Sequence, residues 1–97
     1  MKLRLTPRSF RDLEEISNYI RKRNPYAAER VSAAIRASFK TLLLFHGLGR
    51  RQETTGVRKL VTRRYPYLIY YRMDETASEV DILTIQHPAR DREFEDA

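Results

Sequence analysis

With 97 residues, of which 41% are hydrophobic, the chain is long enough to fold around a single core, and we expect one domain over residues 1–97. The absence of cysteine excludes disulfide bonds and cysteine-based metal or nucleophile sites. The longest apolar run, Leu42 to Phe45, is far shorter than the roughly 20 residues of a membrane-spanning helix, and no signal peptide is recognisable. We therefore expect a cytoplasmic protein without a membrane partner.

The net charge of +6 is concentrated in one part of the chain. Residues 47–72 carry seven basic side chains against the single acid Glu53, and the rest of the chain is neutral. The basic residues of this segment are Arg50, Arg51, Arg58, Lys59, Arg63, Arg64 and Arg72. A cluster of one sign indicates an acidic partner. The alternative is a solvated strand edge, where lysine and arginine block unwanted strand pairing.

The chain begins with a short strand and a helix. Alternation over residues 2–6, with Leu3 and Leu5 on one side, predicts a strand with one buried face. Thr6-Pro7 predicts a helix start, because threonine caps free amides and proline loses no hydrogen bond at the first helical position. This helix should end before Asn24. Its expected buried stripe, spaced by three and four positions, is Phe10, Leu13, Ile16 and Ile20.

A second helix begins almost at once. Asn24-Pro25 repeats the cap-and-proline signal, and the helix should stop in the stretch His46 to Gly49. Its expected buried stripe is Ala28, Val31, Ile35, Phe39, Leu42 and Leu43. The short connection predicts an antiparallel helical hairpin, followed by a charged loop over residues 50–56.

The remaining chain is strand-like. Residues 57–64, 67–73 and 79–86 are rich in valine, isoleucine, tyrosine and threonine, and the connections between them are too short for crossovers. They predict an antiparallel meander. The fold class is therefore α+β with the order β-α-α-β-β-β, an antiparallel sheet packed on one face by the N-terminal helical hairpin.

Both faces of the middle strand are substantially apolar. Tyr67, Ile69, Tyr71 and Met73 share one face, and Leu68, Tyr70 and Arg72 share the other. One helical hairpin covers only one side of a sheet. The second side therefore needs either the C-terminal tail, through Phe94, or another molecule.

Few residues offer catalytic chemistry. His46 and His87 are far apart and belong to no ligand motif, so we expect no metal and no cofactor. His87 follows the last strand and could act as a general acid or base in RNA cleavage, with Arg90 stabilising phosphate charge. The structural alternative, which we favour, is that His87 only ends the strand. Tyrosines beside basic residues could stack on nucleic-acid bases, but in a strand they are more often core residues.

The assembled pattern resembles the toxins of the ParE/RelE superfamily, specifically the ParE-like branch. The resemblance covers nearly the whole chain and is carried by the stretches "LTPRSFRDLEEISNYI", "GVRKLVTRRYPYLIYYRMD" and "VDILTIQHPARDRE", in this order and spacing. It implies an antitoxin partner whose C-terminal segment folds over the toxin. Such docking would explain why a basic cluster lies beside an apolar strand.

The resemblance also separates two mechanisms. RelE-like members cut messenger RNA on the ribosome with basic residues on the sheet, whereas ParE-like members poison DNA gyrase. Lys59 matches a RelE-like basic residue, but Val61 and Leu68 stand where another lysine and a catalytic arginine would be, and Phe94 stands near the place of the tyrosine. Valine and leucine cannot stabilise phosphate charge, so these departures weaken the nuclease hypothesis.

We therefore predict the toxin of a type II toxin–antitoxin pair that binds DNA gyrase, is neutralised by a cognate ParD-like antitoxin in a hetero-oligomer, and needs no catalysis of its own. The residues expected to contact the target or the antitoxin are Arg58, Lys59, Arg63, Arg64, Arg72, His87 and Arg90. The enzyme alternative is a ribosome-dependent endoribonuclease that uses His87, Arg90 and Lys59. The third alternative is a module that only binds nucleic acid through its basic segment.

Overall fold

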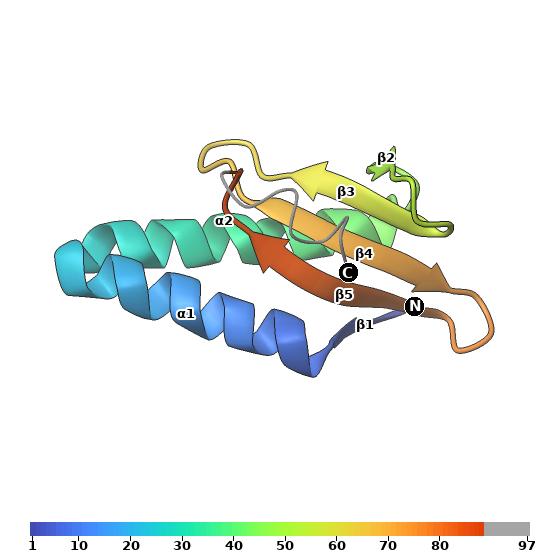
Figure 1. The fold of residues 1–97 in the computed structure, drawn as a ribbon, viewed down its shortest axis with the longest axis horizontal. Coiled ribbons are helices and arrows are strands. Elements are labelled where there is room, and N and C mark those ends of the chain that lie inside the picture. Colours follow the sequence, from blue (N-terminus) through green and yellow to red (C-terminus); the bar gives the residue numbers. More distant parts are fainter. Residues whose placement is uncertain (89–97) are drawn as a thin grey trace.

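A computed structural model describes residues 1–88 and shows an α+β fold in which two helices lie against one face of a sheet (Figure 1). The elements in chain order are β1 (Lys2–Leu5), α1 (Pro7–Arg23), α2 (Pro25–Leu44), β2 (Arg50–Arg51), β3 (Val57–Val61), β4 (Leu68–Asp74) and β5 (Glu79–Gln86). The strand order across the sheet is β1-β5-β4-β3-β2. The α+β class and the order of the main elements agree with the prediction.

Both helix starts follow the predicted cap-and-proline signal. The Thr6 side chain accepts a hydrogen bond from the Ser9 amide at 3.2 Å, and the Asn24 side chain accepts one from the Ala27 amide at 3.2 Å. Asn24 also ends α1, because its own amide donates to the Ile20 carbonyl at 2.7 Å. One residue thus closes the first helix and opens the second, which produces the tight hairpin.

The sheet is mixed rather than wholly antiparallel. The predicted meander of β3, β4 and β5 is antiparallel, but β1 pairs with β5 in parallel, from Lys2 beside Glu79 to Leu5 beside Ile82. A parallel neighbour requires a long crossover, and the helical hairpin supplies it. The expected loop over residues 50–56 also contains the short strand β2, which pairs with Arg58 and Lys59 of β3. Strand β3 ends at Val61, three residues earlier than expected.

The core lies between the helical hairpin and the sheet. Val31, Ile35, Phe39 and Leu42 of α2 pack with the sheet residues Ile69, Tyr71, Val80, Ile82 and Ile85. The α1 residues Leu13, Ile16 and Ile20 pack against this cluster. The predicted stripe of α2 is confirmed, and Ile69 and Tyr71, which were predicted to share a face, both lie on the helix-covered face.

The predicted stripe of α1 is wrong at its first position. Phe10 is 52% exposed, whereas its neighbour Ser9 is fully buried. The Thr6 hydroxyl contacts the carbonyl oxygens of Ile82 and Leu83, and the Ser9 hydroxyl donates to the Thr6 carbonyl at 2.9 Å. These bonds fix the first turn of α1 against β5 with Ser9 inward, and consecutive helical residues point about 100° apart. Phe10 therefore points outward.

The connection from α2 to β2 is held by the hydroxyl of Tyr71. This oxygen donates to the His46 carbonyl at 2.7 Å and accepts from the Gly49 amide at 2.8 Å. Burial is the main cause that raises the pKa of Tyr71, so the hydroxyl keeps the proton that it donates. The turn after α2 is thereby anchored to the middle of the sheet.

Replacing Gly49 by alanine should destabilise the protein. A Cβ there would lie 2.6 Å from the Tyr71 hydroxyl oxygen and 3.0 Å from the Lys59 carbonyl oxygen. Tyr71 is fully buried and cannot move away cheaply, so we expect Gly49→Ala to lower the free energy of unfolding by about 1–3 kcal/mol. Urea denaturation measures this value. Gly47→Ala is the matched control, because its Cβ would meet nothing within 4 Å, and equal losses in both variants would contradict the prediction.

No helix within residues 1–88 is long and apolar enough to cross a membrane.

Candidate functional site

The sheet has a second face, which is turned away from the helices. Directly paired residues of neighbouring strands point to the same side. The pairs of β3 with β4 and of β4 with β5 therefore assign to this face Val57, Lys59, Val61, Leu68, Tyr70, Arg72, Asp81, Thr84 and Gln86. Val57, Leu68 and Tyr70 form a second cluster of buried residues, with Leu83 packed against it. Tyr70 and Tyr71 are both fully buried, so these tyrosines are core residues, as favoured from the sequence.

One row of the second face is uncharged where a nuclease would need charge, and two of its three side chains are apolar. Val61 pairs with Leu68, and Leu68 pairs with Gln86, so the three side chains are cross-strand neighbours. Val61 and Leu68 are the two departures from the RelE-like pattern found in the sequence. The structure places both of them side by side.

The basic residues of the second face have different surroundings. The Lys59 ammonium lies 6.0 Å from the centre of the Tyr70 ring. Arg72 is exposed and lies opposite the buried Asp81 in the β4–β5 ladder. From the neighbouring strand β1, the Arg4 guanidinium lies 3.1 Å from the Asp81 carboxylate. Hydrogen bonding to Asp81 is the main cause that raises the pKa of Arg4.

Arg58 has a structural task that the sequence did not reveal. Its guanidinium donates to the Gly49 carbonyl at 2.8 Å and to the Gly47 carbonyl at 3.1 Å. These bonds hold the turn after α2. Arg58 is therefore the weakest candidate among the residues predicted to contact a target or an antitoxin, because its Nη1 atom already donates to the turn.

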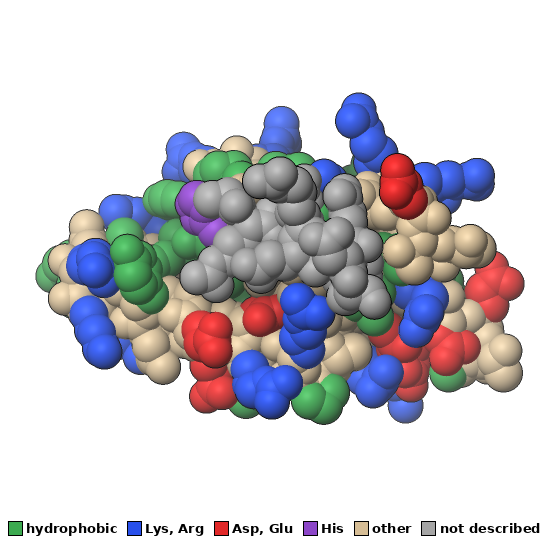
Figure 2. Space-filling model, in the orientation of Figure 1, with side chains coloured by type: hydrophobic (Ala, Val, Ile, Leu, Met, Phe, Trp, Pro, Cys, Tyr) green, Lys and Arg blue, Asp and Glu red, His purple; other side chains and the backbone are tan. Residues whose placement is uncertain are grey.

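Arg63 and Arg64 lie in the exposed connection between β3 and β4. The buried Thr62 organises this connection, since its hydroxyl donates to the Tyr65 carbonyl and accepts from the Tyr67 amide at 2.9 Å. In Figure 2, Lys and Arg side chains project along the rim where β2 and β3 lie in Figure 1. Much of the predicted basic segment thus lies on one edge of the sheet.

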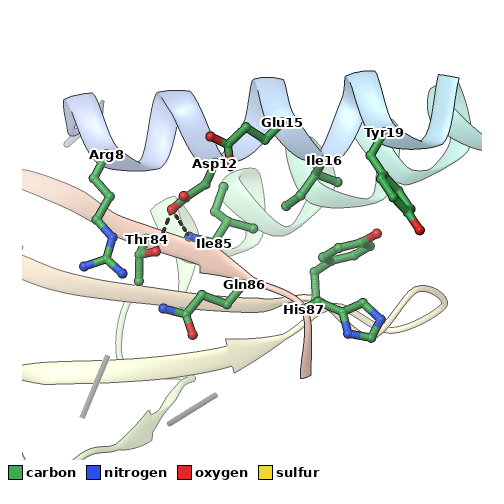
Figure 3. Close-up of a pocket in the computed structure, with 10 residues that line it drawn as sticks. Arg8, Asp12, Glu15, Ile16, Tyr19, Thr84, Ile85, Gln86 and His87 are labelled. Carbon is green, nitrogen blue, oxygen red and sulfur yellow. Dashed lines mark hydrogen bonds between the residues drawn. The ribbon is translucent and has the colours of Figure 1, made fainter. Parts of the chain in front are cut away.

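A pocket of about 490 Å³ lies between α1 and the end of β5 (Figure 3). From α1 it is lined by Arg8, Asp12, Glu15, Ile16 and Tyr19. From the sheet and the residue that follows β5 it is lined by Tyr67, Thr84, Ile85, Gln86 and His87. Burial is the main cause that raises the pKa of Tyr67. The volume is within the range of ligand pockets, roughly 300–1,000 Å³.

Asp12 joins the two walls of the pocket. One oxygen of its carboxylate accepts hydrogen bonds from the Thr84 hydroxyl at 2.5 Å and from the Ile85 amide at 3.0 Å (Figure 3). The β1–β5 ladder ends at Ile82, so beyond that residue no strand within residues 1–88 pairs with β5 on this side. Asp12 therefore takes the place of a neighbouring strand for the Ile85 amide.

Gln86 is the unusual member of the pocket. Its side chain is buried, with 5% of the residue exposed, yet within residues 1–88 neither the amide nitrogen nor the amide oxygen has a hydrogen-bond partner. A buried polar group without a partner costs about 1–3 kcal/mol, and native proteins rarely keep one without a reason. Sequence reasoning missed Gln86. The sequence feature that could have indicated it is a long polar side chain, two residues after Thr84, in a strand whose other residues are mostly apolar.

His87 lies at the rim of the pocket. Its ring meets the Tyr67 ring edge-on, with 5.8 Å between the ring centres. Lys59 lies opposite Tyr70 in the middle of β3, whereas His87 follows the end of β5. Arg90 and Phe94 lie outside the described residues. Within residues 1–88 no group of three or more His, Asp or Glu could hold a metal ion.

Comparison with known proteins identifies the relatives of this chain. The family model described as "ParE toxin of type II toxin-antitoxin system, parDE" matches residues 3–92. The "Putative toxin Y4kP" of Sinorhizobium fredii is 38% identical over 86 residues, which covers 89% of this chain and 86% of that protein. Both comparisons cover most of the chain.

Two solved structures show the same fold. The chromosomal ParDE toxin–antitoxin system of P. aeruginosa superposes with a TM-score of 0.77 and 29% identity, over 90% of this chain and 95% of that chain. The intact RelBE toxin–antitoxin complex of E. coli superposes with a TM-score of 0.64 and 10% identity, over 89% of this chain and 94% of that chain. The second match concerns the fold alone.

Proposed function

Because this chain belongs to the ParE toxin family of type II toxin–antitoxin systems, we propose that its target is DNA gyrase and that a ParD-like antitoxin neutralises it. The family match supports a toxin of this class. The gyrase target and the identity of the antitoxin are the proposed part. Binding to gyrase would arrest growth without any bond being broken by the toxin itself.

The apolar pair Val61 and Leu68 on the second face supports gyrase binding over RNA cleavage, the other mechanism of the superfamily. RNA cleavage needs cations or hydrogen-bond donors that stabilise the charge developing on phosphate. Val61 and Leu68 lie side by side on the second face and supply neither. Lys59 and His87, the described residues of the nuclease hypothesis, lie at the middle of β3 and beyond the end of β5. This arrangement favours a surface that binds a protein.

The basic edge supports a protein partner of opposite charge. Arg63 and Arg64 are exposed on a connection that Thr62 holds in place, and Arg72 is exposed on the second face. Complementary charge raises the rate of association and selects the partner. We therefore assign these arginines, with Lys59, to contact with the antitoxin or with gyrase. His87 and Arg90 remain in the proposed set, and Arg58 is its least favoured member.

A supercoiling assay tests the proposal. Purified toxin should block supercoiling by DNA gyrase or cause cleaved DNA to accumulate, and an excess of the antitoxin encoded beside it should restore normal activity. The antitoxin should reverse the effect because toxin bound to the antitoxin is no longer free to bind gyrase.

A ribosome-bound messenger cleavage assay runs in parallel as the control. We expect no cleavage of the messenger by the same toxin preparation. If gyrase is unaffected while the messenger is cut, the gyrase proposal is wrong and His87, Arg90 and Lys59 become the residues to test as an active site.

A further inference from the structure

The unpaired amide of Gln86 indicates a missing ligand in the α1–β5 pocket. The carboxamide offers one acceptor and two donor hydrogens, and none of them is used within residues 1–88. Thr84 and Ile85 beside it are both satisfied by Asp12. The pocket thus contains one buried polar group that could pair with a molecule that binds there.

The Gln86 carboxamide can pair with a group that offers a hydrogen-bond donor and a hydrogen-bond acceptor side by side. A peptide group of an extended chain has this arrangement, with its N–H and C=O free to pair with a side-chain amide. A partner strand cannot simply extend the sheet at this position, because α1 already occupies the edge of β5 and Asp12 binds the Ile85 amide. A peptide must therefore be recognised by the pocket side chains.

The charges of the pocket distinguish a peptide from a nucleotide. Asp12 and Glu15 contribute two carboxylates to the wall formed by α1, against the single guanidinium of Arg8. A phosphate group would meet both carboxylates, which is unfavourable at short distance. Glu15 is exposed and forms no ion pair with any residue of the described chain, so it can bind a basic side chain. Figure 3 shows Glu15 on α1 and Gln86 on β5, on opposite walls of the pocket.

We propose that the α1–β5 pocket binds an extended segment of the antitoxin, in which a peptide group pairs with the Gln86 carboxamide and a basic side chain pairs with Glu15. This inference rests on the antitoxin partner of the proposed function, and it is independent of the gyrase target. It adds a second docking region of opposite charge to the basic edge of the sheet. The antitoxin would then need an acidic part for that edge and a basic residue for the pocket.

Gln86→Met tests the role of the amide. Methionine keeps the length of the side chain and removes both polar atoms, so the melting temperature of the free toxin should stay the same or rise, because an unpaired buried amide is lost. The dissociation constant for the antitoxin encoded beside the toxin, measured by calorimetry, should increase about tenfold. If Gln86 only supported the fold, Gln86→Met would lower the melting temperature of the free toxin and leave the dissociation constant for the antitoxin unchanged.

Gln52→Met is the matched control for this substitution. Gln52 lies between β2 and β3, where its amide donates to the Arg50 carbonyl at 2.9 Å, and it does not line the pocket. Antitoxin affinity should change less than twofold. The proposal is overturned if Gln86→Met binds the antitoxin as tightly as the parent chain, or if it lowers the melting temperature of the free toxin.

Glu15→Gln tests the charge of the bound segment. We expect weaker antitoxin binding and a smaller dependence of the dissociation constant on salt, because one ion pair is removed. Glu14→Gln, an exposed neighbour on the same helix outside the pocket, should change neither quantity. Equal effects of the two variants would contradict a basic residue in the pocket. If the parent toxin does not bind the antitoxin at all, the partner in the proposed function is wrong and this inference falls with it.

Discussion

Ile35→Ala should lower the free energy of unfolding by about 2–5 kcal/mol. Ile35 is 1% exposed and lies at the centre of α2, where it packs in the core cluster between the hairpin and the sheet. Truncation removes buried methyl and methylene groups and leaves a cavity that neighbours on α2 and the sheet cannot fill completely. The stability of a domain of this size is of order 5–15 kcal/mol, so the loss would be a large fraction of it. Urea denaturation at a fixed pH measures the change.

Leu44→Ala is the matched control on the same helix. Leu44 is 75% exposed, so the same type of truncation should change the free energy of unfolding by less than about 0.5 kcal/mol. Helix propensity would change little, because leucine and alanine are both good helix formers. Similar losses in both variants would show that the buried face of α2 is assigned wrongly.

Asp12→Ala should lower the free energy of unfolding by about 2–4 kcal/mol, because hydrogen bonds to a charged acceptor contribute roughly 1.5–3 kcal/mol each. The variant leaves the Thr84 hydroxyl and the Ile85 amide without their acceptor. Both donors belong to buried residues of β5. The seam between α1 and β5 should therefore loosen more than the rest of the domain.

Hydrogen exchange gives a readout specific to this contact. The Ile85 amide should lose protection in Asp12→Ala by more than amides in the β3–β4 ladder, which do not depend on Asp12. Asp12→Asn keeps a side-chain oxygen as acceptor and should lose less stability than the alanine variant. Unchanged exchange at Ile85 in Asp12→Ala would contradict the role of this carboxylate.

The two faces of the sheet differ in composition and packing. The helix-covered face contains the larger core cluster, and the second face carries the uncharged row, Lys59 and Arg72. A second face with buried apolar residues, a half-buried lysine and an exposed arginine is suited to binding a protein partner. The α1–β5 pocket adds a polar position at the margin of this face. Under the proposed function, an antitoxin would use these surfaces as several chemically distinct contacts.

Local signals predicted the helices and most strands correctly. The threonine and asparagine caps with their following prolines need only neighbouring residues, and both helices begin at the predicted prolines. The α2 stripe also follows from one helix, because a single period places Val31, Ile35 and Leu42 on the same side. The bounds of β5 were correct for a similar reason, since turn residues precede it and proline follows soon after it.

Positions that depend on another element were predicted less well. Phe10 fits the helical period, but contacts of the Thr6 cap with β5 turn Ser9 inward instead. Arg58 reads as a free cation in the sequence, but the turn after α2 brings two carbonyl groups to it. The parallel pairing of β1 with β5 depends on where the hairpin returns the chain.

The sequence by itself determined the order of the main elements, the helix starts, the toxin family resemblance and the replacement of charge by Val61 and Leu68, because each of these depends on residue type and spacing along the chain. Only the tertiary structure decided that Val61, Leu68 and Gln86 form one row, and that Asp12 and Glu15 line a pocket beside β5. Residues about 70 positions apart meet there, as in the contact of Asp12 with Thr84. Strand register and the packing of α1 on the sheet create such contacts, and no local pattern encodes them.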